Sequence, residues 1–373
     1  ANGKAEIDPD KCVSCGMCLV NCPFGAIADK SQIFQVIRAI QSGERVYAAV
    51  APAFVGQFGP KVTPGKLRAA VKQLGFADVF EVAIGADLCA TQEAEDFMRE
   101  VPDELPFMGT SCCPAWVQFV EKHYPELMPH VSTCRSPMEM FGAVLKEQLK
   151  PSTRRIVSVA IMPCTAKKFE VQRDEFKRNG VPDVDYAITT QELIAMIRQA
   201  GIVFDDLEPE SVDMPFGVST GAGVIFGVTG GVTEAVIRRL SDDKSTTALR
   251  AIAFNGVRGM EGVKHTEVEI GGKKVRIAIV SGLNNARPLL DRILEGHKDY
   301  DFIEVMACPG GCVSGAGQPF GTKADKARRG EGLYKADRMS PIKRSEENYA
   351  VTSLYDGVLK GRVHELLHVE YGK

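Results

Sequence analysis

The sequence predicts an α/β fold, with mainly parallel sheets covered by helices and a small cysteine-rich unit at the N-terminus. Two observations predict it. Short continuous apolar runs alternate with stretches of helical periodicity, a pattern typical of strands buried on both faces. Four closely spaced cysteines occupy residues 12–22.

Composition excludes several classes of protein. Of the 373 residues, 45% are hydrophobic and 25% are charged, so the chain is not mainly disordered. The net charge of −3 and the lack of a long basic run argue against a nucleic-acid partner. No apolar stretch reaches about 18 residues, so we expect no membrane span. The first residues carry cysteines and charges, not a signal-peptide core. We therefore expect a cytoplasmic location.

The first element is the cysteine run CVSCGMCLVNCP at 12–23. Its spacing, C-x2-C-x2-C-x3-C-P, is the bacterial pattern for iron–sulfur ligands. Thiolates two residues apart can wrap one face of a 4Fe–4S cubane, and soft sulfur suits iron. A zinc knuckle is the alternative, but it does not need a third and fourth cysteine at this spacing. The predicted ligands are Cys12, Cys15, Cys18 and Cys22.

In two-cluster ferredoxins, the fourth cysteine of this run serves the other cluster. We therefore expect Cys12, Cys15 and Cys18 to face one cluster and Cys22 to point away. The sequence begins at Ala1 rather than Met. We expect that a second run, on a preceding segment or another chain, would complete both clusters.

The next elements follow in order along the chain. Residues 33–40 have helical periodicity, and 46–50 form an apolar strand that ends before Pro52. Thr63-Pro64 predicts the start of a helix that closes at Gly75, because threonine caps helices and proline favours the first helical position. Further strands are expected at 78–84, 156–162, 275–280 and 302–306, and helices at 190–200 and 287–295.

The C-terminal part is polar. Residues 321–348 are rich in Lys, Arg and Glu and predict a surface excursion, followed by a helix near 349–367. We divide the chain into an iron–sulfur unit (1–42), a central catalytic unit (43–320) and a C-terminal extension that wraps it (321–373).

Four more cysteines follow predicted strand ends. Cys113 follows a segment ending near residue 109, Cys164 follows the strand at 156–162, and Cys308 and Cys312 follow the strand at 302–306. Ligands bind at the carboxyl ends of strands in open α/β sheets, so these four thiols are candidates for a second cubane. They are otherwise ordinary buried cysteines, but the glycines flanking Cys312 favour close approach to a bulky group.

Lys167 and Glu170 follow Cys164 at one-turn spacing, where a lysine can donate to an anionic ligand. A solvated helix residue is the alternative for Lys167. Cys89 and Cys134 are left over, and we expect both to be small buried side chains. No histidines form a metal-ligand pair, and we expect surface or capping positions for His123, His265, His297, His364 and His368.

Three blocks of sequence resemble the signature motifs of the iron-only (FeFe) hydrogenases. TSCCPAW at 110–116 resembles TSCCPGW, MPCTAKKFE at 162–170 matches MPCxxKxxE, and MACPGGCVSGAGQP at 306–319 resembles MACxxGCxxGGGQP. The glycine-rich segment at 221–235 also looks like the family. The resemblance covers nearly the whole chain from Cys12 onward.

The resemblance implies an active site called the H-cluster. This is a 4Fe–4S cubane joined through one cysteine sulfur to a two-iron subsite with carbon monoxide, cyanide and azadithiolate ligands. By motif position, Cys113, Cys164 and Cys308 hold the cubane and Cys312 bridges the two parts. Lys167, fixed by Glu170, would bond one cyanide. The remaining contacts would come from Pro52 and Ala53 in the Ala51-Pro52-Ala53 segment, and from Met162, Pro163, Phe226 and Met306.

The resemblance also implies a proton relay. Cys112 is its innermost member, followed by Ser132, Glu93 and Asp96 in decreasing order of proximity. Cys112 lies at the start of an expected helix, where the dipole favours a thiolate. A packing residue beside Cys113 is the alternative for Cys112.

The sequence departs from the family pattern at four positions. Ala115 and Ala316 each replace a glycine and add one methyl group close to the site. Met138 stands where a glutamine is common, and Asp96 stands where the relay usually has a glutamate. These departures indicate a divergent subgroup.

The resemblance implies reversible reduction of protons to H2, with electrons from ferredoxin or a similar carrier. The two-iron subsite would be installed by hydrogenase maturation proteins. One alternative is a slow H2-sensing homologue with the same cofactor, although such homologues often lack the relay cysteine and often carry an added signalling domain. Another is a non-enzymatic relative used in iron–sulfur assembly, which would not need an intact MPCxxKxxE block.

Overall fold

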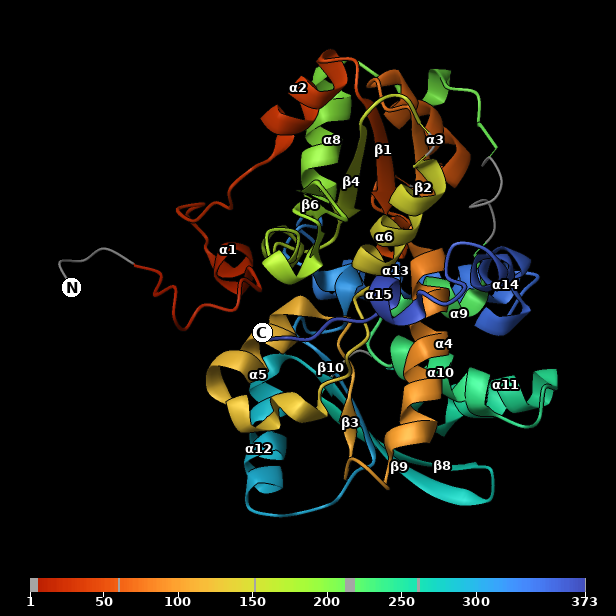
Figure 1. Ribbon diagram of the computed structural model, residues 1–373. Helices are drawn as coiled ribbons and strands as arrows, with labels where there is room; N and C mark the ends of the chain where they lie inside the picture. Colours follow the sequence, from red (N-terminus) through yellow and green to blue (C-terminus); the bar gives the residue numbers. More distant parts are fainter. Residues whose placement is uncertain (1–5, 60, 151, 212–218, 260–261, 373) are drawn as a thin grey trace.

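The computed structural model describes residues 6–59, 61–150, 152–211, 219–259 and 262–372. Two four-stranded sheets form its centre, and Figure 1 shows them one above the other with helices around both. The α-helices are α1 (Met17–Asn21), α2 (Ile33–Gln41), α3 (Pro64–Gln73), α4 (Ala83–Glu100), α5 (Pro114–His123), α6 (Pro137–Leu149), α7 (Ala166–Glu170), α8 (Thr190–Gln199), α9 (Gly221–Val224), α10 (Gly231–Leu240), α11 (Thr246–Ile252), α12 (Leu283–Leu294), α13 (Lys323–Met339), α14 (Tyr349–Asp356) and α15 (Val363–Leu367).

The first sheet is entirely parallel, in the order β2-β1-β4-β7. Its strands are β1 (Arg45–Val50), β2 (Asp78–Glu81), β4 (Ile156–Met162) and β7 (Tyr186–Thr189). Alternate side chains of β1 point to opposite faces of the sheet and pack in two separate hydrophobic clusters. Val46 and Ala48 pack with residues of α2, α3 and α8, whereas Tyr47 and Ala49 pack with residues of α4 and α6. This sheet is therefore covered on both faces, as the continuous apolar runs predict.

The second sheet has the order β3-β10-β9-β8. Its strands are β3 (Met108–Gly109), β8 (Val263–Ile270), β9 (Lys273–Ser281) and β10 (Phe302–Met306). β3, β10 and β9 run parallel, while β8 and β9 form an antiparallel hairpin. Residues of α5 and α12 pack on one face, and residues of α4 and α10 pack on the other. The α/β class with mainly parallel sheets is confirmed.

Several expected elements are also confirmed. The helix at 33–40 is α2, and the side chain of Thr63 accepts a hydrogen bond from the Lys66 backbone nitrogen at the start of α3. The strands at 156–162 and 302–306 have the expected bounds. The helices at 190–200 and 287–295 are α8 and α12.

Three expectations were wrong. The strand at 78–84 ends at Glu81, because α4 begins at Ala83. The polar stretch at 321–348 contains the 17-residue helix α13, whose N-terminus has a capping box formed by Thr322 and Asp325. The expected C-terminal helix near 349–367 is two shorter helices, α14 and α15.

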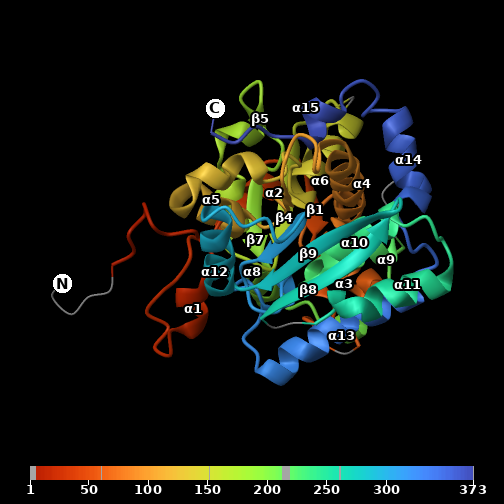
Figure 2. The same ribbon diagram turned by 90° about the horizontal axis from the view of Figure 1, so that it is seen from below.

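The N-terminal segment containing α1 runs along one side of the body, and α13 lies along another edge (Figure 2). Several hydrogen bonds hold this segment to the catalytic unit, and three of them reach the cysteine run. Lys122 Nζ donates to the Cys12 carbonyl at 2.7 Å, Gln118 Nε2 to the Val13 carbonyl at 3.3 Å, and Thr165 Oγ1 to the Ser14 carbonyl at 2.7 Å. Within the described ranges, no helix is long and apolar enough to cross a membrane.

Candidate active site

One cavity lies where the carboxyl ends of strands from both sheets meet. Cys113 follows β3 and caps α5, Cys164 follows β4, and Cys308 and Cys312 follow β10. All four cysteines line this cavity. Three strand ends that are far apart in sequence therefore deliver four thiols to one place, as their positions in the sequence predict.

The spacing of these thiols does not suit a single metal ion. A tetrahedral zinc ion with bonds of about 2.3 Å would hold its thiolates roughly 3.8 Å apart. Among the described residues, the one group of three ligand atoms within 4.8 Å of one another lies elsewhere. No three of these sulfurs are that close, whereas a cubane binds each thiolate at a different corner and needs a wider spacing.

Burial makes these thiols costly to ionise on their own. It raises the pKa of Cys164 to about 11, an effect that Lys167 opposes and Cys113 reinforces. Burial, and then the thiols of Cys164, Cys113 and Cys312, raise the pKa of Cys308 well above its usual value. Bound iron would relieve this repulsion, so the donor set fits an iron–sulfur group.

Lys167 projects from α7 into the same cavity and is 8% exposed. Its Nζ donates to Glu170 Oε2 at 2.7 Å and to the Cys112 carbonyl at 3.4 Å. Burial alone would lower the pKa of Lys167, but Glu170 and Cys164 raise it above its usual value. Lys167 therefore stays an ammonium group and can donate to an anion in the cavity.

The rest of the cavity wall is mostly apolar. It includes every other side chain expected to contact the cofactor, namely Pro52, Ala53, Met162, Pro163, Phe226 and Met306. Gln318 Nε2 donates to the Ala53 carbonyl at 2.9 Å and to the Cys312 carbonyl at 3.5 Å. Gln318 thus ties the 51–53 segment to the Cys312 loop. We assigned it no role from sequence, although it belongs to the third quoted motif.

Cys112 also lines the cavity and is buried. The expected bias toward thiolate was wrong. Burial, and then the charge of Glu93, raise the pKa of Cys112 well above its usual value. The helix begins two residues later at Pro114, so desolvation outweighs the dipole. Burial therefore favours the protonated form of the Cys112 thiol.

Glu93 is the relay candidate whose charge acts on Cys112. It is fully buried on α4, and its Oε1 accepts a hydrogen bond from the Ser111 backbone nitrogen at 3.3 Å. Its Oε2 has no hydrogen-bond partner among the described residues. Burial raises the pKa of Glu93 to about 8. Its carboxyl is therefore placed to gain and lose a proton near neutral pH.

Ser132 and Asp96 are linked through Cys134. Ser132 Oγ accepts from the Cys134 backbone nitrogen at 3.1 Å, and Cys134 Sγ donates to Asp96 Oδ2 at 3.6 Å. Asp96 Oδ1 accepts from Arg99 Nη2 at 2.5 Å, and the Arg99 side chain is 60% exposed. Among the described residues, no hydrogen bond joins Ser132 to Glu93 or to Cys112, so the order Cys112, Ser132, Glu93 and Asp96 that the resemblance implies stays a prediction.

The N-terminal cysteines reach this cavity through Cys15, which is among its lining residues. Burial raises the pKa of Cys15, and the thiols of Cys18, Cys12 and Cys113 raise it further. The Cys22 thiol instead accepts a hydrogen bond from the Ala26 backbone nitrogen at 3.3 Å, and its pKa is lowered. The N-terminal thiols and the cavity thiols are therefore neighbours at Cys15 and Cys113.

Two of the four unusual residues line the cavity, and two do not. Ala115 and Met138 are among the lining residues, whereas Ala316 and Asp96 are not. The methyl group of Ala316 faces Gly16, where an added Cβ would come within 2.4 Å of it. Ala316 therefore packs against the N-terminal unit beside the cavity rather than in the cavity wall.

Other side chains near the site escaped the sequence analysis. Glu139 on α6 is fully buried with no hydrogen bond to either carboxylate oxygen from the described residues, and burial raises its pKa well above the usual value. His368 was expected at a surface or capping position, and it is the C-cap residue of α15. It is only 7% exposed, because partners from α4 and residue 133 enclose the ring. Cys89 and Cys134 are buried, as expected.

Comparison with known proteins identifies three regions. Residues 44–316 match the family described as iron only hydrogenase large subunit, C-terminal domain. Residues 323–373 match iron hydrogenase small subunit, and residues 4–27 match a 4Fe-4S binding domain.

Individual relatives agree with these matches. NADP-reducing hydrogenase subunit HndD of Solidesulfovibrio fructosivorans is 39% identical over 97% of this chain, which spans 66% of that relative. The periplasmic [Fe] hydrogenase large subunit of Nitratidesulfovibrio vulgaris is 40% identical over 84% of this chain and 86% of its own. A solved structure of apo [FeFe]-hydrogenase HydA1 from Chlamydomonas reinhardtii has a TM-score of 0.76 and 33% identity, covering 92% of this chain and 99% of that one.

A more distant group has a different role by name. Cytosolic iron-sulfur assembly component 3 of Bos taurus is 27% identical over 99% of this chain and 84% of its own length. Overall sequence similarity therefore extends both to hydrogenases and to iron–sulfur assembly proteins. Only the residues that line the cavity can distinguish the two roles.

Proposed function

Because this chain belongs to the iron-only hydrogenase family, we propose that it catalyses the reversible reduction of protons to H2. The convergence of four thiols, Lys167 and the Cys112 thiol on one largely apolar cavity supports this activity over a role in iron–sulfur assembly. A cluster that only served assembly or electron transfer would need the thiols but not a buried ammonium group and a protonated thiol beside them.

Cys113, Cys164 and Cys308 would hold the cubane of the H-cluster, and Cys312 would bridge it to the two-iron subsite. When bound, this cofactor supplies the electron transfer and the hydrogen chemistry. Lys167, oriented by Glu170, would donate to one anionic ligand, and the 51–53 backbone would contact another. Met162, Phe226 and Met306 would keep water out of the cavity.

The protein's own groups would move the proton. Cys112 would deliver it to the cavity, and the outer members Ser132, Glu93 and Asp96 would resupply Cys112. The raised pKa of Cys112 supports this role, because a thiol that stays protonated can act as a donor. The raised pKa of Glu93, about 8, supports exchange of its proton near neutral pH.

Electrons would arrive through the N-terminal cluster on Cys12, Cys15 and Cys18, with Cys22 turned away. The proximity of Cys15 to Cys113 supports this route. Ferredoxin or a similar carrier would be the donor, and maturation proteins would install the two-iron subsite. We retain the cytoplasmic location and the division at 1–42, 43–320 and 321–373 as proposals.

The test is to produce the chain with maturation proteins and record its infrared spectrum and H2 evolution from a reduced dye. We expect carbon monoxide and cyanide bands together with sustained turnover. Cys312→Ala should lose the bands of the two-iron subsite, whereas the matched control Cys89→Ala should keep them. If the bands were present but H2 turnover were slow, the chain would be better described as an H2-sensing homologue. If the wild-type chain lacked the bands, a role in iron–sulfur assembly would be favoured instead.

A further inference from the structure

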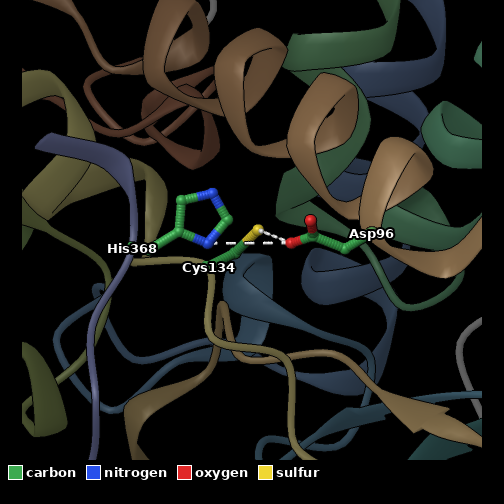
Figure 3. Close-up of side chains that lie close together, drawn as sticks. All are labelled: Asp96, Cys134 and His368. Atoms are coloured by element: carbon green, nitrogen blue, oxygen red, sulfur yellow. Dashed lines mark hydrogen bonds and ion pairs between the residues drawn. The ribbon is translucent and has the colours of Figure 1, made fainter. Parts of the chain in front are cut away.

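Three buried side chains outside the cavity point at one another from distant parts of the chain (Figure 3). Asp96 lies near the end of α4, Cys134 lies just before α6, and His368 follows α15. Each offers one ligand atom, and these three atoms all lie within 4.8 Å of one another. The exposed fractions of Asp96, Cys134 and His368 are 2%, 0% and 7%.

Two of the three distances are close to those that one zinc ion imposes. Asp96 Oδ2 lies 3.6 Å from Cys134 Sγ and 3.7 Å from His368 Nδ1. Tetrahedral zinc with ordinary bond lengths separates an oxygen and a sulfur ligand by about 3.6 Å, and an oxygen and a nitrogen ligand by about 3.4 Å. Cys134 Sγ and His368 Nδ1 also lie within 4.8 Å of each other, so these two atoms need to approach by at most about 1.3 Å to fill the site.

Outer hydrogen bonds orient two of these ligands. Gln92 Nε2 donates to Tyr355 at 2.9 Å and to Glu95 at 3.2 Å, so Gln92 Oε1 faces His368 Nε2 and accepts its hydrogen bond at 3.2 Å. His368 therefore carries its hydrogen on Nε2, and Nδ1 keeps a lone pair that can bind a metal. Arg99 Nη2 donates to Asp96 Oδ1, the carboxylate oxygen that does not face the cluster. Hydrogen bonds that orient the ligands in this way are typical of built metal sites.

We propose that Asp96, Cys134 and His368 form a zinc site with three protein ligands and a fourth position open to water. One carboxylate and one thiolate would balance the charge of Zn2+, and a neutral imidazole would complete the set. Binding would release the Cys134 thiol proton to solvent as the sulfur–zinc bond forms. It would also replace the 3.0 Å hydrogen bond between Thr133 Oγ1 and His368 Nδ1.

The site lies within reach of the surface. The exposed side chain of His364 stacks on His368, with ring centroids 5.2 Å apart. His364 can capture a metal ion from solvent and pass it inward. Zinc at Asp96 would also occupy the outermost member of the proton route, so it would inhibit turnover; this consequence rests on the proposed function.

The test uses the mature holoenzyme, incubated with Zn2+ and desalted, with zinc and iron measured per chain. Wild type and the matched control Cys89→Ala should each retain one more zinc ion than Cys134→Ala and His368→Gln. X-ray absorption at the zinc edge should show one sulfur at about 2.3 Å with oxygen and nitrogen ligands. Iron content shows whether each variant has folded and kept its clusters.

If wild type and the three variants retained equal amounts of zinc, the proposed zinc site would be refuted. Zinc should also lower H2 turnover severalfold in wild type and Cys89→Ala, but not in Cys134→Ala. If zinc bound at this site without lowering H2 turnover, the proposed inhibition by zinc would be refuted. A holoenzyme with no turnover before zinc is added would refute the proposed function, and zinc retention would still decide the site.

Discussion

At the scale of single residues, the proton on Cys112 is the feature on which turnover depends. Burial keeps the thiol protonated, and Glu93 is its acidic neighbour. We expect Cys112→Ala to keep the carbon monoxide and cyanide infrared bands but to lose about a hundredfold or more of H2 evolution, the usual contribution of a positioned acid. Cys112→Asp should retain more activity than Cys112→Ala, because a carboxyl can still carry a proton.

A matched control variant makes this prediction specific. Cys89→Ala removes another buried thiol of the same core and should leave turnover close to that of wild type. If Cys112→Ala, loaded with cofactor, turned over at the wild-type rate, protons would have to reach the cavity by a route that avoids this thiol.

Glu93 gives a prediction about pH. Burial raises its pKa from 4.5 to about 8. Between these values the folded protein keeps a proton that the unfolded chain has lost, so the contribution of Glu93 to stability falls as pH rises through this window and levels off above it. In Glu93→Gln this contribution is absent. The calorimetric Tm of Glu93→Gln should therefore rise relative to that of wild type as the pH increases from 5 to 8. If the Tm of both proteins changed equally with pH, the raised pKa of Glu93 would be contradicted.

The residue scale also shows where sequence reasoning fails. The positions of the four cavity thiols could be predicted, because each follows a strand end. The burial of His368 could not, because its partners Gln92 and Thr133 lie more than 200 positions earlier in the chain. The direction of the Cys112 pKa shift was missed for a similar reason, since it depends on how deeply tertiary packing buries the thiol.

At the scale of elements, α13 is held to the body by charge. The Oδ2 atom of Asp337 accepts hydrogen bonds from Arg238 at 2.8 Å and from Arg258 at 2.9 Å, and Glu234 bonds both arginines from the other side. Removing one partner of a buried ion pair leaves an uncompensated charge and costs about 3–5 kcal/mol. We therefore expect Asp337→Ala to lower Tm by several degrees in calorimetry.

The same helix offers a matched control. Glu331 and Arg338 form an exposed pair at 2.5 Å, with side chains that are 63% and 56% exposed. Exposed pairs contribute only about 0–1 kcal/mol, so Glu331→Ala should change Tm little. Equal losses in the two variants would mean that the Asp337 cluster does not hold α13.

This charge-based packing explains why α13 was not expected as a helix. Its buried residues include Gly330 and Asp337, and Leu333 is its one buried large apolar residue. A search for apolar periodicity therefore finds only a polar stretch. By contrast, α2 and α3 each place an apolar face on the first sheet, and both could be predicted from sequence.

At the scale of the whole molecule, two sheets and the N-terminal unit meet around one cavity. Parallel strands within each sheet, and thiols at their carboxyl ends, could be predicted from local patterns. The separation of those strands into two sheets could not, because β3 is only two residues long and pairs with a strand almost 200 residues later. The hairpin of β8 and β9 was likewise missed, since alternation in β8 is masked by its charged residues.

The contact between the N-terminal unit and the catalytic unit depends on Gly16. Its φ of +72° favours glycine, and a Cβ there would lie 2.4 Å from the Ala316 Cβ and 2.6 Å from Thr165 Oγ1. An alanine at this position must therefore push the Cys15 loop away from Cys113. Since electrons are proposed to cross at this contact, we expect Gly16→Ala to lower carrier-driven H2 evolution severalfold while the infrared bands of the two-iron subsite stay unchanged.

Gly25 separates this effect from simple backbone strain. It lies in the same unit with a φ of +59°, but a Cβ there would meet no atom within 4 Å. Gly25→Ala therefore imposes a similar left-handed strain without moving the Cys15 loop, and it should leave carrier-driven turnover close to wild type. If both variants lost turnover equally, strain within the N-terminal unit would explain the loss. If neither did, electrons would reach the cavity without crossing between Cys15 and Cys113, and the extra methyl group of Ala316 would have no bearing on catalysis.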